Sequence, residues 1–213
     1  MKARASTICS IFLIAGIIAG FSAYTPKSQA AAPRMFITWE ARTFYPSDFP
    51  GKSLPVTNSA VTASAFVAQD GTLMNPDGIT FTWYVDGEWL GQELGKREAT
   101  FSVSKLKGDA HAIRVLATLS TGERVETSVR IPITSPAIVV QANREGDGTS
   151  VRALPFFFNV HSLAELVFSW IVNNSRQEAQ TNTVTLQPPA ALSVSAVNTK
   201  NQLEFARQTL QLP

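Results

Sequence analysis

The stretch ITFTWYVDGEW, residues 79–89, decides the fold, because it combines a strand pattern with a tight turn. Apolar residues occupy every second position, which is the period of a half-buried strand: Ile79, Phe81, Trp83 and Val85. Asp86-Gly87 follows, and this pair favours a type I′ turn, in which both central residues have positive φ. The stretch therefore predicts a β-hairpin with Trp83 on its buried face.

A second stretch, LVFSWIVNNSR at residues 166–176, repeats this pattern and aligns with the first without a gap. Leu166, Phe168, Trp170 and Val172 take the positions of the four apolar residues above. Asn173-Asn174 takes the position of the turn, and asparagine also tolerates the left-handed conformation. We therefore expect two copies of one module in tandem, with Trp83 and Trp170 each in the core of its own copy.

Short alternating runs separated by turn residues fill the chain after Pro33. This rhythm is typical of antiparallel β-sandwiches. Thr134-Ser135-Pro136 interrupts it, because proline cannot donate to a strand ladder. We predict an all-β chain of two tandem immunoglobulin-like antiparallel sandwiches, in three parts: a signal or anchor segment at 1–30, a first domain at 34–134 and a second, less regular domain at 136–213.

Residues 162–172 also fit a helix, which is an alternative for the second Trp stretch. Leu163, Leu166, Val167, Trp170 and Ile171 follow helical spacing, and Ser162 with Glu165 forms a capping-box pattern. Bulky and β-branched residues dominate the segment, however, and its aligned copy ends in Asp-Gly. We predict a strand here.

The N-terminus has the layout of a secretory signal. Lys2 and Arg4 precede an apolar run from Ile8 to Tyr24, and Ser28-Gln29-Ala30 offers a cleavage site before Ala31. The same run is close to the length of a membrane span, so residues 8–24 are alternatively an uncleaved anchor. Both alternatives export residues 31–213 to the cell envelope or the outside, with Lys2 and Arg4 left in the cytoplasm.

Composition narrows the function classes. Three of the 18 basic residues lie in the first 30, so the remaining chain carries 15 basic and 16 acidic groups. This near-neutral body lacks the clustered basic residues of a nucleic-acid-binding protein. The single cysteine, Cys9, lies in the N-terminal apolar run. We therefore expect no disulfide and no thiolate metal site in the body, which packing alone must stabilise.

The sequence ITFTWYVDG, followed by ATFSVSKLKGDAHAIRVLATLSTGERVETSVRIPI, resembles bacterial immunoglobulin-like modules of the PKD type. In these modules a strand ends in Trp, a tight turn follows, and a later strand enters through a Gly-x-Tyr-x-Val corner. Gly108 to Ile113 stands at that corner, with His111 where tyrosine is frequent. The resemblance covers about residues 34–134 and weakens over 136–213. It implies a spacer or binding unit of a surface or secreted protein, which is rarely catalytic.

The sequence gives little support for a catalytic site or a metal-binding site. The chain has two histidines, His111 and His161, one in each expected module, and no Gly-x-Ser-x-Gly elbow. His111 is expected to be a structural corner residue that bonds to the backbone. Asp and Glu in the predicted turns raise the alternative of calcium, but Asp beside Gly is ordinary turn chemistry. We expect no enzyme activity and no cofactor.

Aromatic residues outside the core are the candidates for partner binding. Trp89 follows the tight turn, and with Tyr84 and Trp39 it is a candidate exposed patch for a sugar or a protein. If the run PFFF at 155–158 is a regular strand, at least one Phe must point away from the core face, and that surface is a candidate interface between the two modules. We expect an exported adhesion, scaffold or surface-assembly protein that binds envelope proteins, or alternatively a carbohydrate-binding module that uses exposed aromatics.

Overall fold

The computed structural model describes residues 31–177 and 181–213, and every regular element in them is a strand or a short 3₁₀ turn. The expected signal or anchor segment, including Cys9 and residues 8–24, lies outside the described residues. Among the described residues, no helix has the length and apolar character needed to cross a bilayer.

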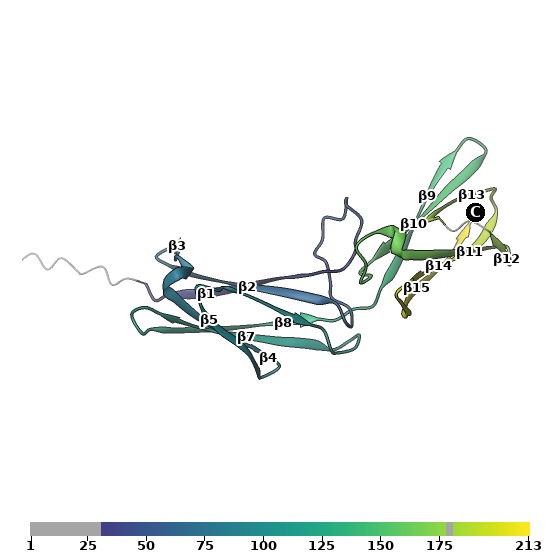
Figure 1. Cartoon of the computed structure of the whole chain (residues 1–213). Coiled ribbons are helices and arrows are strands. Elements are labelled where there is room, and N and C mark those ends of the chain that lie inside the picture. The colour runs from purple at the N-terminus through teal and green to yellow at the C-terminus, as the bar shows by residue number, and fades with distance from the viewer. Residues whose placement is uncertain (1–30, 178–180) are drawn as a thin grey trace, which may run out of the picture. The chain divides into compact units, whose positions relative to one another are not determined.

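Four antiparallel sheets make up the fold, two in each half of the chain (Figure 1). Sheet I centres on β2 (Ala60–Gln69), which pairs with β1 (Arg34–Ala41) on one side and with β3 (Thr72–Leu73) and β6 (Glu98–Ser102) on the other. Sheet II has the order β5 (Glu88–Leu94), β4 (Ile79–Val85), β7 (Ala110–Leu119), β8 (Arg124–Pro132). A 3₁₀ turn, η1 (Pro76–Gly78), leads into β4.

The second half repeats this order. Sheet III contains β13 (Thr183–Leu186), β10 (Gly148–Phe156) and β9 (Ala137–Glu145). Sheet IV has the order β12 (Ser175–Gln177), β11 (Leu166–Val172), β14 (Ala190–Asn198), β15 (Asn201–Leu212). In immunoglobulin nomenclature, both halves have strands A, B and E in one sheet and strands C′, C, F and G in the other. The chain is therefore a tandem of immunoglobulin-like sandwiches with one shared topology.

Each half has its own hydrophobic core. The first core joins the inward residues of sheets I and II, such as Val61 and Ile113, and the second joins those of sheets III and IV, such as Val151 and Leu192. The alternation of the strands produces both cores, because successive side chains point to opposite faces of a sheet.

The two Trp hairpins match each other residue by residue. Phe81 lies opposite Ala117 and Trp83 opposite Val115 in the first half, while Phe168 lies opposite Ala196 and Trp170 opposite Val194 in the second. Both tryptophans are buried. The turns match as well, since Asp86 and Gly87 have φ of 53° and 91° and Asn173 and Asn174 have φ of 48° and 65°. The predicted repeat is present in backbone conformation and in core pairing.

Residues 163–165 form a single 3₁₀ turn, η2 (Leu163–Glu165), and the strand β11 follows directly. The helical alternative fails at the expected cap, because the Ser162 side chain makes no capping hydrogen bond. Instead, Glu165 accepts a hydrogen bond from the backbone N–H of His161 and pairs with Lys200. The pairing of β11 with β14 satisfies the backbone that a helix would have used.

The connection between β1 and β2, residues 42–59, contributes to the second core. The N–H of Phe44 donates to the carbonyl of Phe158 at 2.7 Å, and the N–H of Phe157 donates to the carbonyl of Phe44 at 2.6 Å. The Phe44 ring packs against the second core, and Phe49 meets the ring edge of Phe156 at a centroid distance of 5.2 Å. The PFFF run thus contacts the connection between β1 and β2. The domain boundaries at 134 and 136 remain a prediction.

The two tryptophans differ in one polar contact. The indole Nε1–H of Trp170 donates to the carbonyl of Thr181 at 2.9 Å. The indole nitrogen of Trp83 is buried and has no hydrogen-bond partner among the residues that the structure describes. A buried N–H without a partner lowers stability by its desolvation cost.

We expect Trp170→Phe to reduce the free energy of unfolding by about 1–2 kcal/mol more than Trp83→Phe. Both changes remove the same ring volume, but Trp170→Phe breaks a hydrogen bond to the Thr181 carbonyl, whereas Trp83→Phe removes a buried N–H that has no partner among the described residues. Urea denaturation followed by circular dichroism measures the difference. Equal losses, or a larger loss for Trp83→Phe, would contradict this assignment.

We expect Phe44→Ala to lower the free energy of unfolding by about 2 kcal/mol, because a half-buried ring leaves the second core. Phe36→Ala is the matched control, since Phe36 is exposed on the outer face of sheet I and should change stability by less than about 0.5 kcal/mol. Differential scanning calorimetry of both variants checks the pair. Indistinguishable melting curves for the two variants would show that Phe44 does not support the second core.

Candidate interaction surfaces

The outer face of sheet II brings together two of the predicted aromatic residues. Trp89 on β5 lies directly opposite Tyr84 on β4, so both side chains leave the same face. A register shift between Trp83 and Tyr84 makes Leu90 an extra residue on β5, directly after Trp89. Trp89 is 64% exposed.

Arg114 extends this row across β7. It lies opposite Tyr84 and its guanidinium sits 4.0 Å from the centroid of the Tyr84 ring, a cation–π geometry. Arg114 also contacts the carboxylate of Glu126 at 3.4 Å, and both side chains are substantially exposed. The row from Trp89 through Tyr84 and Arg114 to Ser128, which we call the aromatic row, crosses all four strands of the sheet.

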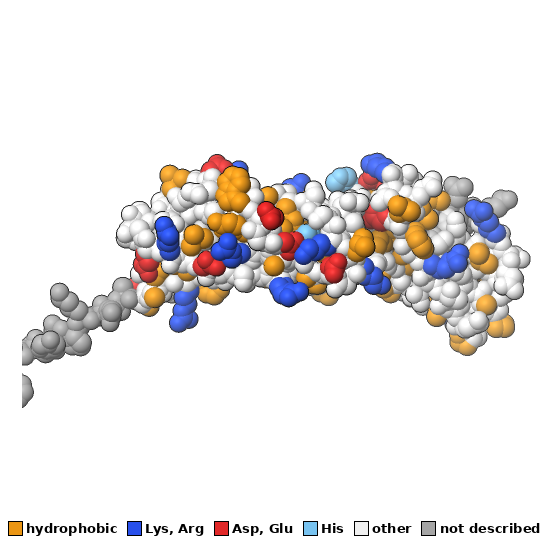
Figure 2. Space-filling view, turned by 90° about the horizontal axis from the view of Figure 1, so that it is seen from below, with side chains coloured by type: hydrophobic (Ala, Val, Ile, Leu, Met, Phe, Trp, Pro, Cys, Tyr) orange, Lys and Arg blue, Asp and Glu red, His pale blue; other side chains and the backbone are white. Residues whose placement is uncertain are grey.

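Figure 2 views the molecule from below Figure 1, and apolar, basic and acidic side chains are interspersed on that side. The register identifies the charged residues of the outer face of sheet II: Arg114, Arg124, Glu126 and Arg130. Glu88 and Glu93 on β5 are paired with Val85 and Phe81, whose side chains face the core. The two glutamates therefore point to the inner face of sheet II and not to its outer face. The outer face therefore carries three basic groups and one acidic group.

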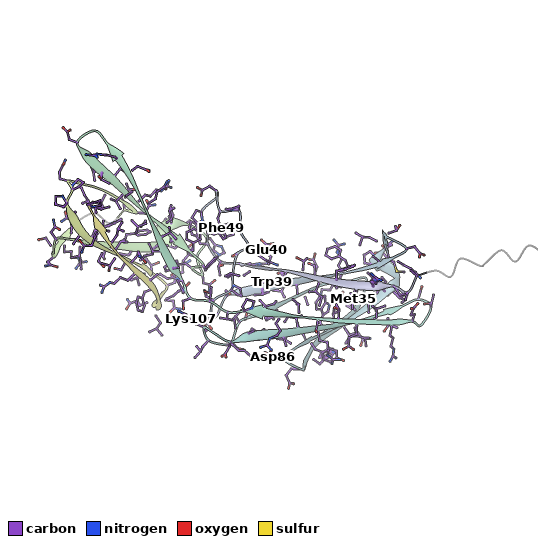
Figure 3. All side chains as sticks on the ribbon, turned by 180° about the vertical axis from the view of Figure 1, so that it is seen from behind. Met35, Trp39, Glu40, Phe49, Asp86 and Lys107 are labelled. Atoms are coloured by element: carbon purple, nitrogen blue, oxygen red, sulfur yellow. The ribbon has the colours of Figure 1, made fainter. Side chains whose placement is uncertain are left out.

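Trp39 does not join the aromatic row. It lies on β1 in sheet I, packs with Ile37 against the first core, and carries the Lys52 ammonium 3.7 Å from its ring centroid (Figure 3). Burial lowers the pKa of Lys52, and the nearby Glu40 opposes this effect. The three aromatic residues predicted as one patch thus fall on two different sheets, because the sequence pattern does not specify which strands pair.

The corresponding face of sheet IV has a different composition. Ile171, Ser193 and Thr209 occupy the positions of Tyr84, Arg114 and Ser128, and Arg176 occupies that of Trp89. A separate apolar row contains Val167, Val197 and Phe205, and Phe205 is 60% exposed. Leu203, near the turn into β15, is 90% exposed.

His111 stands at the corner where the chain enters β7, and its side chain is buried. Its Nδ1 lies 2.6 Å from Asp86 Oδ2, and its Nε2 accepts from the backbone N–H of Ser104 at 3.4 Å. A neutral imidazole with its proton on Nδ1 satisfies both contacts. Phe101 meets the ring edge-on at 5.3 Å. His111 thus ties the β4–β5 turn to the connection between β6 and β7.

Asp86 is the centre of this corner. Its Oδ1 accepts from the Lys105 ammonium at 2.8 Å and from the Ala112 N–H at 2.9 Å. Desolvation favours a higher pKa for Asp86, but the hydrogen bonds from Lys105, Ala112 and His111 outweigh it and lower the pKa to about 2. Asn173 makes the equivalent bond in the second half, accepting from the Ala191 N–H at 2.9 Å.

The remaining candidates for chemistry are dispersed. His161 is exposed and donates its backbone N–H to Glu165. Among residues 31–177 and 181–213, no group of three or more His, Cys, Asp and Glu side chains is arranged to hold a metal ion. Of the turn carboxylates considered for calcium, Asp86 is occupied by the corner hydrogen bonds.

The sequence pattern predicted neither the position of Arg114 beside Tyr84 nor the contact between Asp86 and His111. Both depend on strand register, since Arg114 meets Tyr84 only when β4 and β7 pair, and residues 86 and 111 are far apart in the chain. The one sequence signal was the predicted corner at His111, for which we expected a hydrogen bond to the backbone and not a contact with Asp86.

No family model matches the sequence, and no curated protein matches it. Among solved structures, it is similar to three N-terminal domains of the highly immunogenic outer capsid protein Hoc of bacteriophage RB49, at 15% identity and a TM-score of 0.48. That match covers 84% of this chain and 58% of the Hoc chain, so the chain spans little more than half the length of that structure.

Two further solved structures are similar. Fibronectin(III)-like modules of Clostridium thermocellum CbhA match at 13% identity and a TM-score of 0.33, covering 83% of this chain and 92% of theirs. A C-terminal fragment of intimin, solved with the intimin-binding domain of its receptor, matches at 15% identity and a TM-score of 0.30, covering 87% and 64%. All three TM-scores lie below 0.5, so the fold assignment rests on strand order and register alone.

We expect the stability of the protein to fall as the pH drops from about 4 to about 2, because Asp86 has a lower pKa in the folded state than in the unfolded chain. The stabilisation is fully present above the unfolded pKa of about 4 and is on the order of 1–2 kcal/mol after allowing for partial exposure. Asp86→Asn keeps the Oδ1 acceptor, as Asn173 does, but removes the charge.

Urea midpoints measured from pH 2 to pH 6 test this expectation. Asp86→Asn should flatten the slope below pH 4, whereas Asp48→Asn, which removes a carboxylate from an exposed turn, should retain the wild-type slope. An unchanged slope in Asp86→Asn would show that other groups control the acid transition.

Proposed function

We propose that the protein is an exported, non-enzymatic surface or envelope protein that works by presenting the outer faces of its two sandwiches to partner proteins. The observation that carries this proposal is the exposure of large apolar side chains on sheets whose opposite faces pack the cores. Trp89 on sheet II and Leu203 and Phe205 on sheet IV are 64%, 90% and 60% exposed. Large apolar side chains exposed on the outer face of a sheet are a feature of contact surfaces.

The N-terminal sequence supports the proposed export. The basic residues Lys2 and Arg4 and the apolar run 8–24 fit a signal that is cleaved before Ala31 or retained as an anchor. The PKD type is our proposed assignment within immunoglobulin-like modules, on the strength of the corner around His111. The domain limits of 34–134 and 136–213 belong to the same proposal.

Carbohydrate binding is the second candidate, and the exposed Trp89 beside Tyr84 favours it. An aromatic ring next to polar groups such as Gln92 suits the mixed surface of a sugar. Two observations favour a protein instead. Arg114 already covers one face of the Tyr84 ring, and the aromatic row crosses a sheet face, whereas small-ligand sites are usually concave.

A pull-down of residues 31–213 from fractionated cell envelope tests the proposed function. We expect one or more envelope proteins to be retained specifically, and retention should fall in a variant that combines Trp89→Arg with Phe205→Ser. Phe36→Ala serves as the control for an exposed aromatic on sheet I. Retention of glycan fractions alone would support the second candidate, and recovery of neither class would contradict both.

A further inference from the structure

The shared topology does not require three residues of the aromatic row. The second sandwich has the same strand order and the same Trp–Val pair in its core, yet it carries Ile171, Ser193 and Arg176 where the first carries Tyr84, Arg114 and Trp89. The topology therefore tolerates other side chains at these positions. Since the three side chains are at least partly exposed, their shared position on one face calls for another explanation.

The chemistry of the aromatic row is that of a protein-binding hot spot. Tryptophan, tyrosine and arginine are the residues most enriched where a few side chains supply most of the binding free energy. The Tyr84 ring holds the Arg114 guanidinium at 4.0 Å, so less side-chain freedom is lost when a partner binds. The contact between Arg114 and Glu126 is long, at 3.4 Å, so most N–H donors of the Arg114 guanidinium are left for an incoming group.

The charge of the surrounding face indicates the partner. Arg124 and Arg130 share the outer face with Arg114, and Glu126 is the one acidic side chain that the strand register places there. A guanidinium matches a carboxylate through two parallel hydrogen bonds. Among the residues that the structure describes, neither Arg124 nor Arg130 has an ion-pair partner.

We propose that the outer face of sheet II docks an acidic segment of a partner protein, with Trp89 and Tyr84 as aromatic anchors and Arg114 as the carboxylate contact. This inference rests on the proposed function and names the surface and partner class for it. Arg130 lies diagonally next to Arg114 across β7 and β8 and adds a second contact for a carboxylate.

The test pans a phage-displayed library of random peptides against residues 31–213. Each recovered peptide is then measured by NMR shift mapping against the protein and its variants. We expect recovered peptides rich in Asp and Glu, shifts confined to the aromatic row, and binding that weakens as salt is raised. Arg114→Ser and Trp89→Arg, which install the residues of the second sandwich, should each weaken binding about tenfold or more.

Arg207→Ser is the matched control, because it removes an exposed arginine from the outer face of sheet IV. It should leave peptide binding unchanged. The inference would be overturned if Arg114→Ser weakened the binding of none of the recovered peptides, or if lysine-rich peptides bound equally well. It would also be overturned if the aromatic row shifted only with an acidic sugar, an oligogalacturonate, and with no peptide. If Arg114→Ser still retains envelope proteins at the wild-type level, this surface is excluded while the proposed function stands.

Discussion

Each sandwich depends on one indole ring that packs between its two sheets. Trp83 and Trp170 sit at the same position of the same strand, opposite a valine of the next strand, two residues after a phenylalanine that lies opposite an alanine. A large side chain beside a small one fills the space between the sheets without a void. The tight turn that follows holds this strand in register, because both of its central residues adopt positive φ.

The corner at Asp86 shows how a turn residue acquires a structural role. In both halves the first turn residue accepts a hydrogen bond from the strand that enters beside it, Ala112 in one and Ala191 in the other. Among the described residues, the corner of the first half also contains a charged carboxylate, a buried imidazole and the Lys105 ammonium, which have no counterpart at Asn173. The two corners therefore share one backbone hydrogen bond and differ in charge, and the charged corner at Asp86 is sensitive to acid.

The fold was largely predictable from the sequence, because alternation, Asp-Gly and the repeat around the two tryptophans depend on neighbouring residues. The strand at 166–172 was predictable for the same reason, although helical spacing competed with it. The surfaces were not predictable to the same extent. Trp89 and Tyr84 lie close together in the chain and were paired correctly, whereas Trp39 belongs to another sheet, and Arg114 enters the aromatic row only through strand pairing.

Two separate cores stabilise the fold, and the outer faces of the sheets are free to differ. Nuclear Overhauser contacts of the two buried indoles test this most directly. We expect contacts from the Trp83 indole to the first core, including Val61 and Ile113, and from the Trp170 indole to the second, including Val151 and Leu192. Contacts from both indoles to one common set of side chains would contradict it.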